Sequence, residues 1–418
     1  MYERTLLSNG IRVVTEHIPY VRSATIGLWV KTGARDERPE ASGISHFIEH
    51  MLFKGTKRRS ARRIAEEMDA IGGQLNAFTS KEYTCFYAKV LDTHVALAVD
   101  ILADMFLNSA FDPAELDKER GVIIEEIKMY EDSPDELAHD ELARAVWGNR
   151  SLGLNIIGSV ETVMGLSRED LISHMASHYG PDRIVVSCAG NVTHRQVVEL
   201  VEKYFSGLEP APGGVESPRP IPLYRNVFRT KDTEQLHMCI GLPGLPRNHP
   251  DRFALYLVDT ILGGGMSSRL FQDLREDRGL VYSTYSYHAS YEHSGILVIY
   301  AAMSPSNAGV VASLIQDAVR KLVREGPCEE ELARGKEQLK GNMLLGLEST
   351  SNRMSRLAKM ELFDDRLYTE EETLDLINAV TMQDVTKLLH DLVDGVRVSI
   401  AVVGPRAEDL KDRIAVEL

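Results

Sequence analysis

Hydrophobic and polar positions along the chain follow two alternating periods, one typical of strands and one typical of helices. Short runs rich in β-branched residues, such as RIVVSCAG at 183–190, are typical of buried strands. Longer amphipathic stretches lie between such runs, and the best delimited is DPAELDKERGVIIEEIKMYED at 112–132. Asp112 can act as its N-cap, Pro113 suits the first helical position, and Glu115 can complete a capping box. The pattern predicts an α+β fold with helices packed on a sheet.

The same order of elements occurs twice. Residues 167–192 match residues 381–406, with Gly190 opposite Gly404 at an offset of 214. A repeat of about 200 residues indicates a duplicated domain, because the units of a solenoid are about 20–50 residues long. A proline-rich and glycine-rich segment between the copies indicates a linker. We therefore predict two homologous domains, each an antiparallel-rich sheet with helices packed on one face, at residues 1–208 and 225–418, joined by a linker at 209–224.

The segment GISHFIEHMLFKGT at 43–56 places two histidines and a glutamate in an otherwise apolar stretch. Each residue of a helix advances by about 100°, so His46, Glu49 and His50 fall in one sector while Ile48 points elsewhere. Two imidazoles from successive turns can hold zinc, and a catalytic site then needs a third protein ligand and an open position. The H-x-x-E-H order is the inverzincin signature. The motif alone leaves two alternatives, a metal site or a core helix whose histidines make ordinary hydrogen bonds.

A third ligand is predicted on the helix at 112–132. Glu119 and Glu126 are seven residues apart, so they lie within about 20° of each other, whereas Glu125 falls about 100° away. Carboxylates on an apolar stripe are costly unless they are paired or bound to a cation, and a zinc ion would supply that charge. The alternative is a pair of edge glutamates that reach solvent. The apolar residues expected on the stripe are Val122, Ile123, Met129 and Tyr130.

The second copy of the domain limits the number of metal sites. Its counterpart of the histidine motif, RFALYLVDTILGGG at 252–265, has no histidine. We therefore expect one zinc ion (Zn2+) per chain, in the first half. His174 and His178 also have the i, i+4 spacing, but the second copy has leucines at these places, so we interpret them as core or edge residues.

Composition and charge restrict the classes of partner. The chain of 418 residues is 44% hydrophobic and 26% charged, which is typical of a soluble globular protein. Its formal charge of −15 makes nucleic acid an unexpected partner. The basic run KGTKRRSARR at 54–63 could be a nucleic-acid patch, but it lacks aromatic residues for stacking. We interpret it as the solvated face of a helix that begins near Ser60.

Cysteine usage and hydropathy indicate the compartment. Four widely spaced cysteines form no C-x-x-C pair, which is typical of buried thiols in a reducing compartment. The first residues show no apolar signal segment, and no apolar run approaches the roughly 20 residues of a membrane span. We expect a cytoplasmic protein that does not enter a membrane.

Four segments together resemble the pitrilysin-like inverzincin metallopeptidases, in the branch of mitochondrial processing peptidase and its bacterial relatives. They are HFIEH at 46–50, GGQLNAFTSKEYTCFYAKV at 72–90, ERGVIIEEIKMYEDSPDE at 119–136 and SSRLFQDLREDRGLVYSTYS at 267–286. The resemblance covers essentially the whole chain. It implies a zinc metalloendopeptidase that hydrolyses unfolded peptides or presequence-like segments.

The resemblance also implies a role for individual residues. His46, His50 and Glu126 correspond to the zinc ligands, Glu49 to the catalytic base that activates the zinc-bound water, and Glu119 to a glutamate that supports the site. Two residues of the second half, Arg275 and Tyr282, correspond to side chains that reach toward the substrate. The strand containing Asn76, Ala77 and Phe78 corresponds to an edge strand to which an extended peptide adds.

The arrangement of these motifs bears on the partners. Heterodimeric relatives tend to carry the metal motif and the arginine–tyrosine pair on different subunits, whereas this chain carries both, so we expect a homodimer or a self-sufficient chain. Two alternatives remain open, namely the catalytic subunit of a heterodimer that is inactive alone and a non-catalytic scaffold subunit. The short run GGGMSS at 263–268 is interpreted as a turn after a helix and not as a substrate loop.

Overall fold

A computed structural model describes residues 2–211, 219–364, 366–395, 397–414 and 416, so residues 212–218 of the predicted linker lie outside the described part of the chain. The chain forms two compact units. The first unit comprises the described residues of Met1–Lys128, Arg150–Pro218 and Gly346–Tyr368, and the second those of Met129–Asn149, Arg219–Leu345 and Thr369–Leu418.

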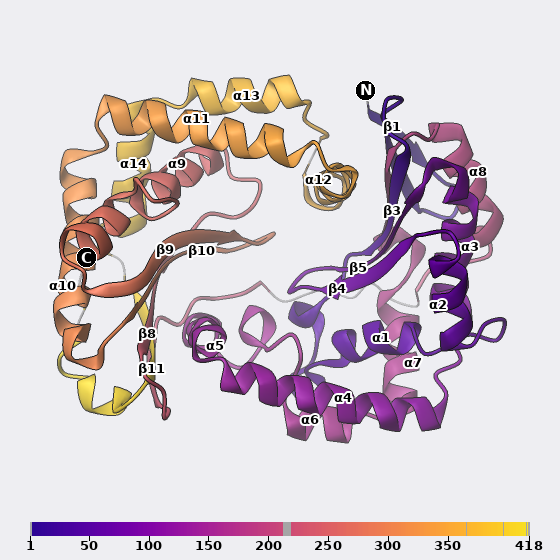
Figure 1. Ribbon diagram of the computed structural model, residues 1–418, viewed down its shortest axis with the longest axis horizontal. Helices are drawn as coiled ribbons and strands as arrows, with labels where there is room; N and C mark the ends of the chain where they lie inside the picture. The colour runs from indigo at the N-terminus through magenta and orange to yellow at the C-terminus, as the bar shows by residue number, and fades with distance from the viewer. Residues whose placement is uncertain (1, 212–218, 365, 396, 415, 417–418) are drawn as a thin grey trace. The chain divides into compact units, whose positions relative to one another are not determined.

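The first unit contains a six-stranded sheet in the order β1-β2-β6-β3-β5-β4 (Figure 1). Strands β2 and β6 run parallel and the other neighbours run antiparallel. The short strand β4 forms one edge of the sheet. The strands are β1 (Tyr2–Leu6), β2 (Arg12–His17), β3 (Ser23–Val30), β4 (Gln74–Thr79), β5 (Thr84–Leu91) and β6 (Ile184–Gly190).

The second unit contains a five-stranded sheet in the order β7-β11-β8-β10-β9. Its one parallel pair, β7 with β11, occupies the same place as β2 with β6 in the first sheet. The common strand order confirms the prediction of two homologous α+β domains with antiparallel-rich sheets. The strands are β7 (Asn226–Thr230), β8 (Leu236–Pro243), β9 (Val281–Ser290), β10 (Gly295–Met303) and β11 (Ser399–Gly404).

Helices α3 (Val95–Asn108) and α8 (His194–Phe205) pack on one face of the first sheet, as the hydrophobic pattern predicted. The ring of Phe106 on α3 lies 6.4 Å from that of Phe86 on β5 and 6.0 Å from that of Phe205 on α8. The opposite face is covered by α12 (Thr350–Phe363), which comes from the second half of the sequence (Figure 1). There the Trp29 indole Nε1 on β3 donates to Met354 Sδ at 3.1 Å.

The second sheet is covered in the same way. Helices α9 (Arg252–Leu262), α10 (Ala308–Glu325) and α14 (Met382–Val393) bury one face in a large apolar cluster. The other face contacts α5 (Pro134–Trp147), which comes from the first half of the sequence. Each half of the sequence thus contributes one helix to the unit built mainly from the other half. The hydrophobic pattern did not predict this second helical layer.

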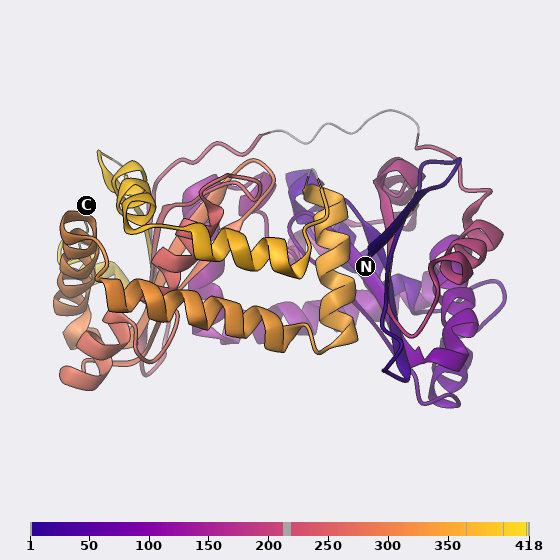
Figure 2. The same ribbon diagram turned by 90° about the horizontal axis from the view of Figure 1, so that it is seen from above.

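The remaining helices connect the elements described above. In the second unit, α11 and α13 lie side by side in both views (Figures 1 and 2), and Lys336 Nζ on α11 donates to the Asn378 carbonyl at 2.7 Å. No helix of the described residues is long and apolar enough to cross a membrane. The remaining helices are α1 (Ile44–Leu52), α2 (Ala61–Asp69), α4 (Pro113–Asp132), α6 (Val160–Gly165), α7 (Arg168–His178), α11 (Glu329–Gly346) and α13 (Glu370–Ala379).

Candidate metal centre

Helix α1 carries the histidine motif, and a residue outside the helix holds its first turn. Glu37 accepts hydrogen bonds from the backbone amides of Gly43 (2.7 Å) and Ser45 (2.9 Å). These amides would otherwise lack a partner, because Gly43, the N-cap, has no side chain to accept from them. Gly43 has φ +94°, and a Cβ there would lie 2.9 Å from Gly158 Cα, so both the conformation and the close approach require glycine.

Helix α4 presents its carboxylates beside a buried stripe that is narrower than predicted. Glu119 and Ile123 are buried, and Glu126 is half-buried. Val122 and Met129, expected on the stripe, are 50% and 64% exposed, so that part of the prediction was wrong. Both lie about 100–120° around the helix from the centre of the buried stripe, while Glu126 lies nearer to it.

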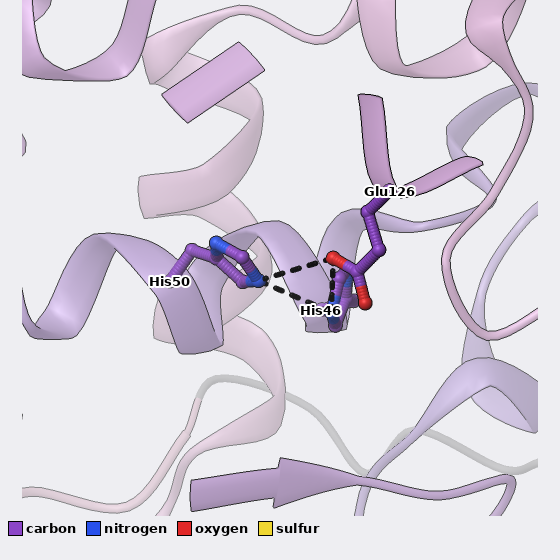
Figure 3. A group of neighbouring side chains, drawn as sticks. All are labelled: His46, His50 and Glu126. Carbon is purple, nitrogen blue, oxygen red and sulfur yellow. Dashed lines mark hydrogen bonds and ion pairs between the residues drawn. The ribbon is translucent and has the colours of Figure 1, made fainter. Parts of the chain in front are cut away.

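His46, His50 and Glu126 converge at one point (Figure 3). His50 Nε2 lies 3.2 Å from His46 Nε2, and Glu126 Oε2 lies 3.6 Å from each of these nitrogens. Ligand atoms at two corners of a tetrahedral zinc site are about 3.3–3.5 Å apart, given zinc–ligand distances of about 2.0–2.2 Å. The three donors therefore fit three corners of such a site. In the part of the chain that the structure describes, one group of three histidine, cysteine or acidic side chains is placed to hold a metal ion, and it is this one.

The surroundings of the two imidazoles differ. Burial, followed by the neighbouring His50, lowers the pKa of His46 to about 3, so its ring is uncharged at neutral pH. His50 Nδ1 lies 3.0 Å from Glu119 Oε2, and an imidazole can bond to a carboxylate there when Nδ1 carries the proton. The lone pair of His50 then lies on Nε2, which faces His46 and Glu126. Carboxylates that hold the second nitrogen of a ligating histidine are common around metal sites.

Glu49 lies on the same helix and is held by Thr79, a residue that no sequence motif singles out. Thr79, the last residue of β4, donates its hydroxyl to Glu49 Oε2 at 2.5 Å. Burial raises the pKa of Glu49, against the hydrogen bond from Thr79, which lowers it. A carboxylate with a raised pKa suits proton transfer near neutral pH. No spacing rule could have found Thr79, since it is 30 residues away on a strand.

Asn76, Ala77 and Phe78 lie on β4, the edge strand. Asn76 is exposed, and its side-chain oxygen accepts from the Ala77 amide at 2.8 Å. The Phe78 ring packs against the rings of Trp29 (5.5 Å) and Tyr87 (6.2 Å), on the face that α12 covers. Phe78 therefore packs its side chain into the unit while its backbone remains on the edge strand.

Arg275 and Tyr282 belong to the second unit, where they are neighbours. The Arg275 guanidinium carbon lies 6.0 Å from the centre of the Tyr282 ring and 5.0 Å from that of Phe271. Tyr282 is 72% exposed. It lies where the register of β9 with β10 shifts, because Val281 pairs with Met303 and Ser283 with the adjacent residue of β10. Such a bulge turns a side chain out of the ladder and is frequent beside functional sites.

The second histidine pair has a geometry unsuited to a metal. The rings of His174 and His178 on α7 stack at 4.0 Å with an angle of 12° between their planes. A ligand nitrogen directs its lone pair in the plane of its ring, so two parallel stacked rings cannot both aim at one ion. The rings of His46 and His50, at 67°, can do so. The geometry supports the interpretation of His174 and His178 as packing residues.

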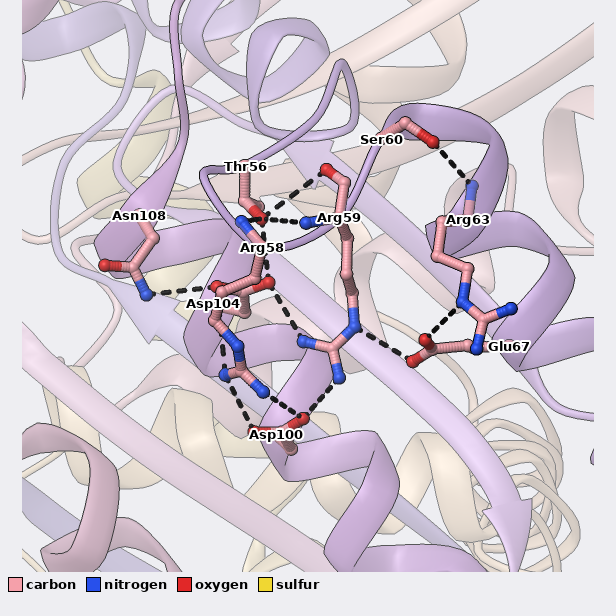
Figure 4. Close-up of polar contacts among 9 residues, drawn as sticks. All are labelled: Thr56, Arg58, Arg59, Ser60, Arg63, Glu67, Asp100, Asp104 and Asn108. Carbon is pink, nitrogen blue, oxygen red and sulfur yellow. Dashed lines mark hydrogen bonds and ion pairs between the residues drawn. The ribbon is translucent and has the colours of Figure 1, made fainter.

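The arginines of the basic run are engaged by carboxylates (Figure 4). Ser60 is the N-cap of α2, which confirms the predicted start of that helix. Arg58 forms two hydrogen bonds with Asp100, at 3.0 and 3.1 Å. Arg59, 8% exposed, contacts Asp100 and also pairs with Asp104 and Glu67, each at 2.9 Å. Both arginines therefore form ion pairs with carboxylates of the same unit.

Comparison with known proteins gives the family. The model of the insulinase family, peptidase family M16, matches residues 12–160, and that of the M16 inactive domain matches residues 165–339. The zinc protease YmxG of Bacillus subtilis is 48% identical over 392 residues, which are 94% of this chain and 96% of that protein. The chain belongs to peptidase family M16. A zinc protease of Streptomyces coelicolor is 41% identical over 99% of this M16 chain and 91% of its own length.

Two solved structures show the same fold. A protease from Helicobacter pylori has a TM-score of 0.90 at 22% identity, over 97% of this chain and 100% of its own. An M16 inactive domain from Pseudomonas fluorescens also has a TM-score of 0.90, at 19% identity, over 97% of this chain and 98% of its own. The family models and the relatives confirm the predicted resemblance to pitrilysin-like peptidases, and the model of the M16 inactive domain covers most of the half that lacks the H-x-x-E-H motif.

Proposed function

We propose that the chain is a zinc metalloendopeptidase that binds one zinc ion through His46, His50 and Glu126. The observation that carries the proposal is the spacing of the three donor atoms, 3.2–3.6 Å, which fits a tetrahedral zinc site. Membership of a peptidase family and the names of the relatives, which are zinc proteases, support the same conclusion.

A zinc ion in this place would polarise a substrate carbonyl and lower the pKa of a water molecule toward 7. Glu49 then accepts the proton of the attacking water and returns it to the amine that leaves. Thr79 fixes the Glu49 carboxylate through the bond to Oε2, which leaves Oε1 for the water. Glu119 holds His50 with its Nε2 toward the metal.

The substrate is proposed to be an extended peptide that adds to β4. An edge strand offers unpaired backbone groups, which bind a peptide through its main chain with loose side-chain specificity. That backbone would come from Asn76, Ala77 and Phe78. Unfolded or presequence-like peptides can adopt the extended conformation that such pairing requires. Tyr282 and Arg275 are proposed to contact the substrate, the tyrosine at the oxyanion and the arginine at the peptide backbone or terminus. The exposed hydroxyl of Tyr282 on a bulge supports its part.

A homodimer, or a chain that acts alone, is proposed as the working form in the cytoplasm. The metal motif and the arginine–tyrosine pair are on one chain, so no second kind of subunit is needed to supply either. Cys85, Cys188 and Cys239 are buried free thiols, which suits a reducing compartment. Light scattering on the purified chain measures the number of subunits.

The test uses the purified chain without added partners. A quenched, unstructured peptide is incubated with the protein, with and without a chelator, and after zinc is restored. The proposal predicts cleavage that the chelator abolishes and zinc restores. Zinc-independent cleavage would contradict it, and absence of cleavage in a zinc-loaded chain would indicate either a scaffold or a heterodimer subunit that is inactive alone. The variant His50→Ala should lose bound zinc in elemental analysis.

A further inference from the structure

Lys54 contacts the carboxylate that supports His50. The chain leaves α1 in a turn, in which the Lys54 amide donates to the Met51 carbonyl at 3.0 Å. This turn brings Lys54 Nζ to 2.6 Å from Glu119 Oε1. The other oxygen of the same carboxylate, Oε2, lies 3.0 Å from His50 Nδ1. Both oxygens of Glu119 are therefore engaged, one by an ammonium group and one by the imidazole.

Burial makes the ammonium group important to Glu119. The side chain of Glu119 is 6% exposed and that of Lys54 is 30% exposed. A buried carboxylate is costly without an opposite charge or several donors, and His50 offers it a single ring nitrogen. Because Lys54 holds Oε1, the carboxylate cannot rotate away from His50 without losing a charge-assisted hydrogen bond.

The orientation of His50 decides which of its nitrogens can bind a metal. With Nδ1 occupied by Glu119, Nε2 is the nitrogen 3.2 Å from His46 Nε2 and 3.6 Å from Glu126 Oε2. A rotation of the ring would separate these three donors. The contacts thus form a continuous chain from Lys54 through Glu119 to His50 and the donor cluster.

We propose that Lys54 is a positioning residue of the metal centre, which fixes Glu119 and through it the ligand orientation of His50. The proposal rests on the proposed role of His46, His50 and Glu126 as zinc ligands. Other lysine–carboxylate pairs on α4 differ from this one. Lys118 with Glu115 and Lys128 with Glu125 are solvent-exposed pairs within the helix, and neither carboxylate is bonded to a histidine.

A plainer role for Lys54 would be to tie α1 to α4, and a matched control separates the two roles. Arg120, the residue after Glu119, also joins these helices, since its guanidinium carbon lies 5.5 Å from the centre of the Phe47 ring on α1. Its Nη2 donates to the Leu166 carbonyl at 2.8 Å. Arg120→Met therefore removes a link between the helices without touching a metal donor or its carboxylate.

The experiment compares Lys54→Met, Lys54→Arg and Arg120→Met with the wild-type chain. Zinc affinity is measured by competition with a chelator, and the geometry of the site is measured from the visible spectrum of the cobalt(II)-substituted protein. The thermal midpoint of the metal-free protein reports the stability of each variant. Neither metal measurement depends on peptidase activity.

The proposal predicts that Lys54→Met weakens zinc binding by about tenfold or more and shifts the cobalt spectrum, because Glu119, the direct partner of His50, loses its fixed position; loss of such a partner usually costs about 10–100-fold. Lys54→Arg should retain zinc binding within about fivefold, because a cation remains. Arg120→Met should lower the thermal midpoint and leave zinc affinity within about twofold.

Three results would overturn the proposal: zinc affinity within about twofold of wild type in Lys54→Met, equally weak binding in Lys54→Arg, or an equal loss in Arg120→Met. If the His50→Ala variant bound zinc as tightly as the wild-type chain, that result would contradict the proposed ligand set instead. Failure of the function and failure of this inference are therefore distinguishable.

Discussion

Replacement of Glu37 by Gln should make the first unit more stable relative to wild type as the pH rises. Glu37 is 6% exposed and holds the first turn of the helix that carries the metal motif. Burial raises the pKa of its carboxyl group to about 7, although the amides of Ser45 and Gly43 lower it. Gln keeps the shape and one acceptor oxygen and cannot ionise.

The magnitude follows from the difference between the folded and unfolded pKa. Below about pH 4.5 Glu37 is protonated in both the folded and the unfolded chain, and its neutral carboxyl group makes its full contribution to the free energy of unfolding. Between about 4.5 and 7 the unfolded chain releases the proton and the folded chain keeps it, so the free energy of unfolding falls as pH rises. The full loss is about 3 kcal/mol, at about 1.4 kcal/mol per pKa unit, and about 2 kcal/mol of it lies between roughly pH 5.5 and 8.5.

The assay is denaturant unfolding of the metal-free protein, followed by tryptophan fluorescence. The chain has two tryptophans, Trp29 in the first unit and Trp147 in the second. In a Trp147→Phe background, Trp29 alone reports the first unit, which avoids treating a two-unit chain as one transition. The comparison between Glu37 and Gln cancels the titration of other groups to first order.

The predicted result is a wild-type-minus-Gln difference in unfolding free energy that falls by about 2 kcal/mol across that range. A difference that stays constant would show that the Glu37 carboxyl group has an ordinary pKa. A difference that rises with pH would show that the two amide hydrogen bonds outweigh burial, and would refute the reasoning.

Three further predictions concern other contacts. Thr79→Val should lower kcat by about tenfold with zinc content and KM unchanged, because Glu49 loses its hydroxyl donor. Thr79→Ser keeps a hydroxyl and should keep the wild-type kcat. Equal kcat in the wild-type chain and both variants would refute this positioning role. Met354→Ala should destabilise the first unit by about 2–5 kcal/mol in Trp29 fluorescence, although the residue comes from the second half of the sequence; no change there would contradict its place in that core. Arg59→Met should cost about 3–5 kcal/mol in the same assay, because it removes the close cation of the fully buried Asp104 carboxylate, and a loss below about 1 kcal/mol would count against this.

The sequence predicted those features that local periodicity and repetition encode. The strand and helix periods indicated the fold class, and the repeat indicated two related sheets. The helical spacing put His46 and His50 on one face, while the family resemblance singled out Glu126, which the structure places beside them. Val122 and Met129 are exposed against expectation, because helical spacing locates a buried stripe but does not give its width, which depends on the elements that pack against it.

The features that the sequence did not predict depend on contacts between distant segments. An amphipathic pattern shows that a helix buries one face, but not which sheet it covers, so the exchange of α5 and α12 between the halves could not be foreseen. Thr79 and Glu37 are polar residues with unremarkable neighbours in sequence, and their roles follow from hydrogen bonds to α1. Lys54 acquires its position from a turn after that helix.

The most direct test of the central claim is the behaviour of Glu49→Gln, measured for zinc content and peptide turnover on the same preparation. The variant should keep the zinc content of the wild-type chain, because the three ligand side chains are intact. Turnover of the quenched peptide should fall by about 10²–10⁴-fold, the usual contribution of a general base. A zinc-loaded variant that cleaves the peptide within about twofold of the wild-type rate would contradict the account.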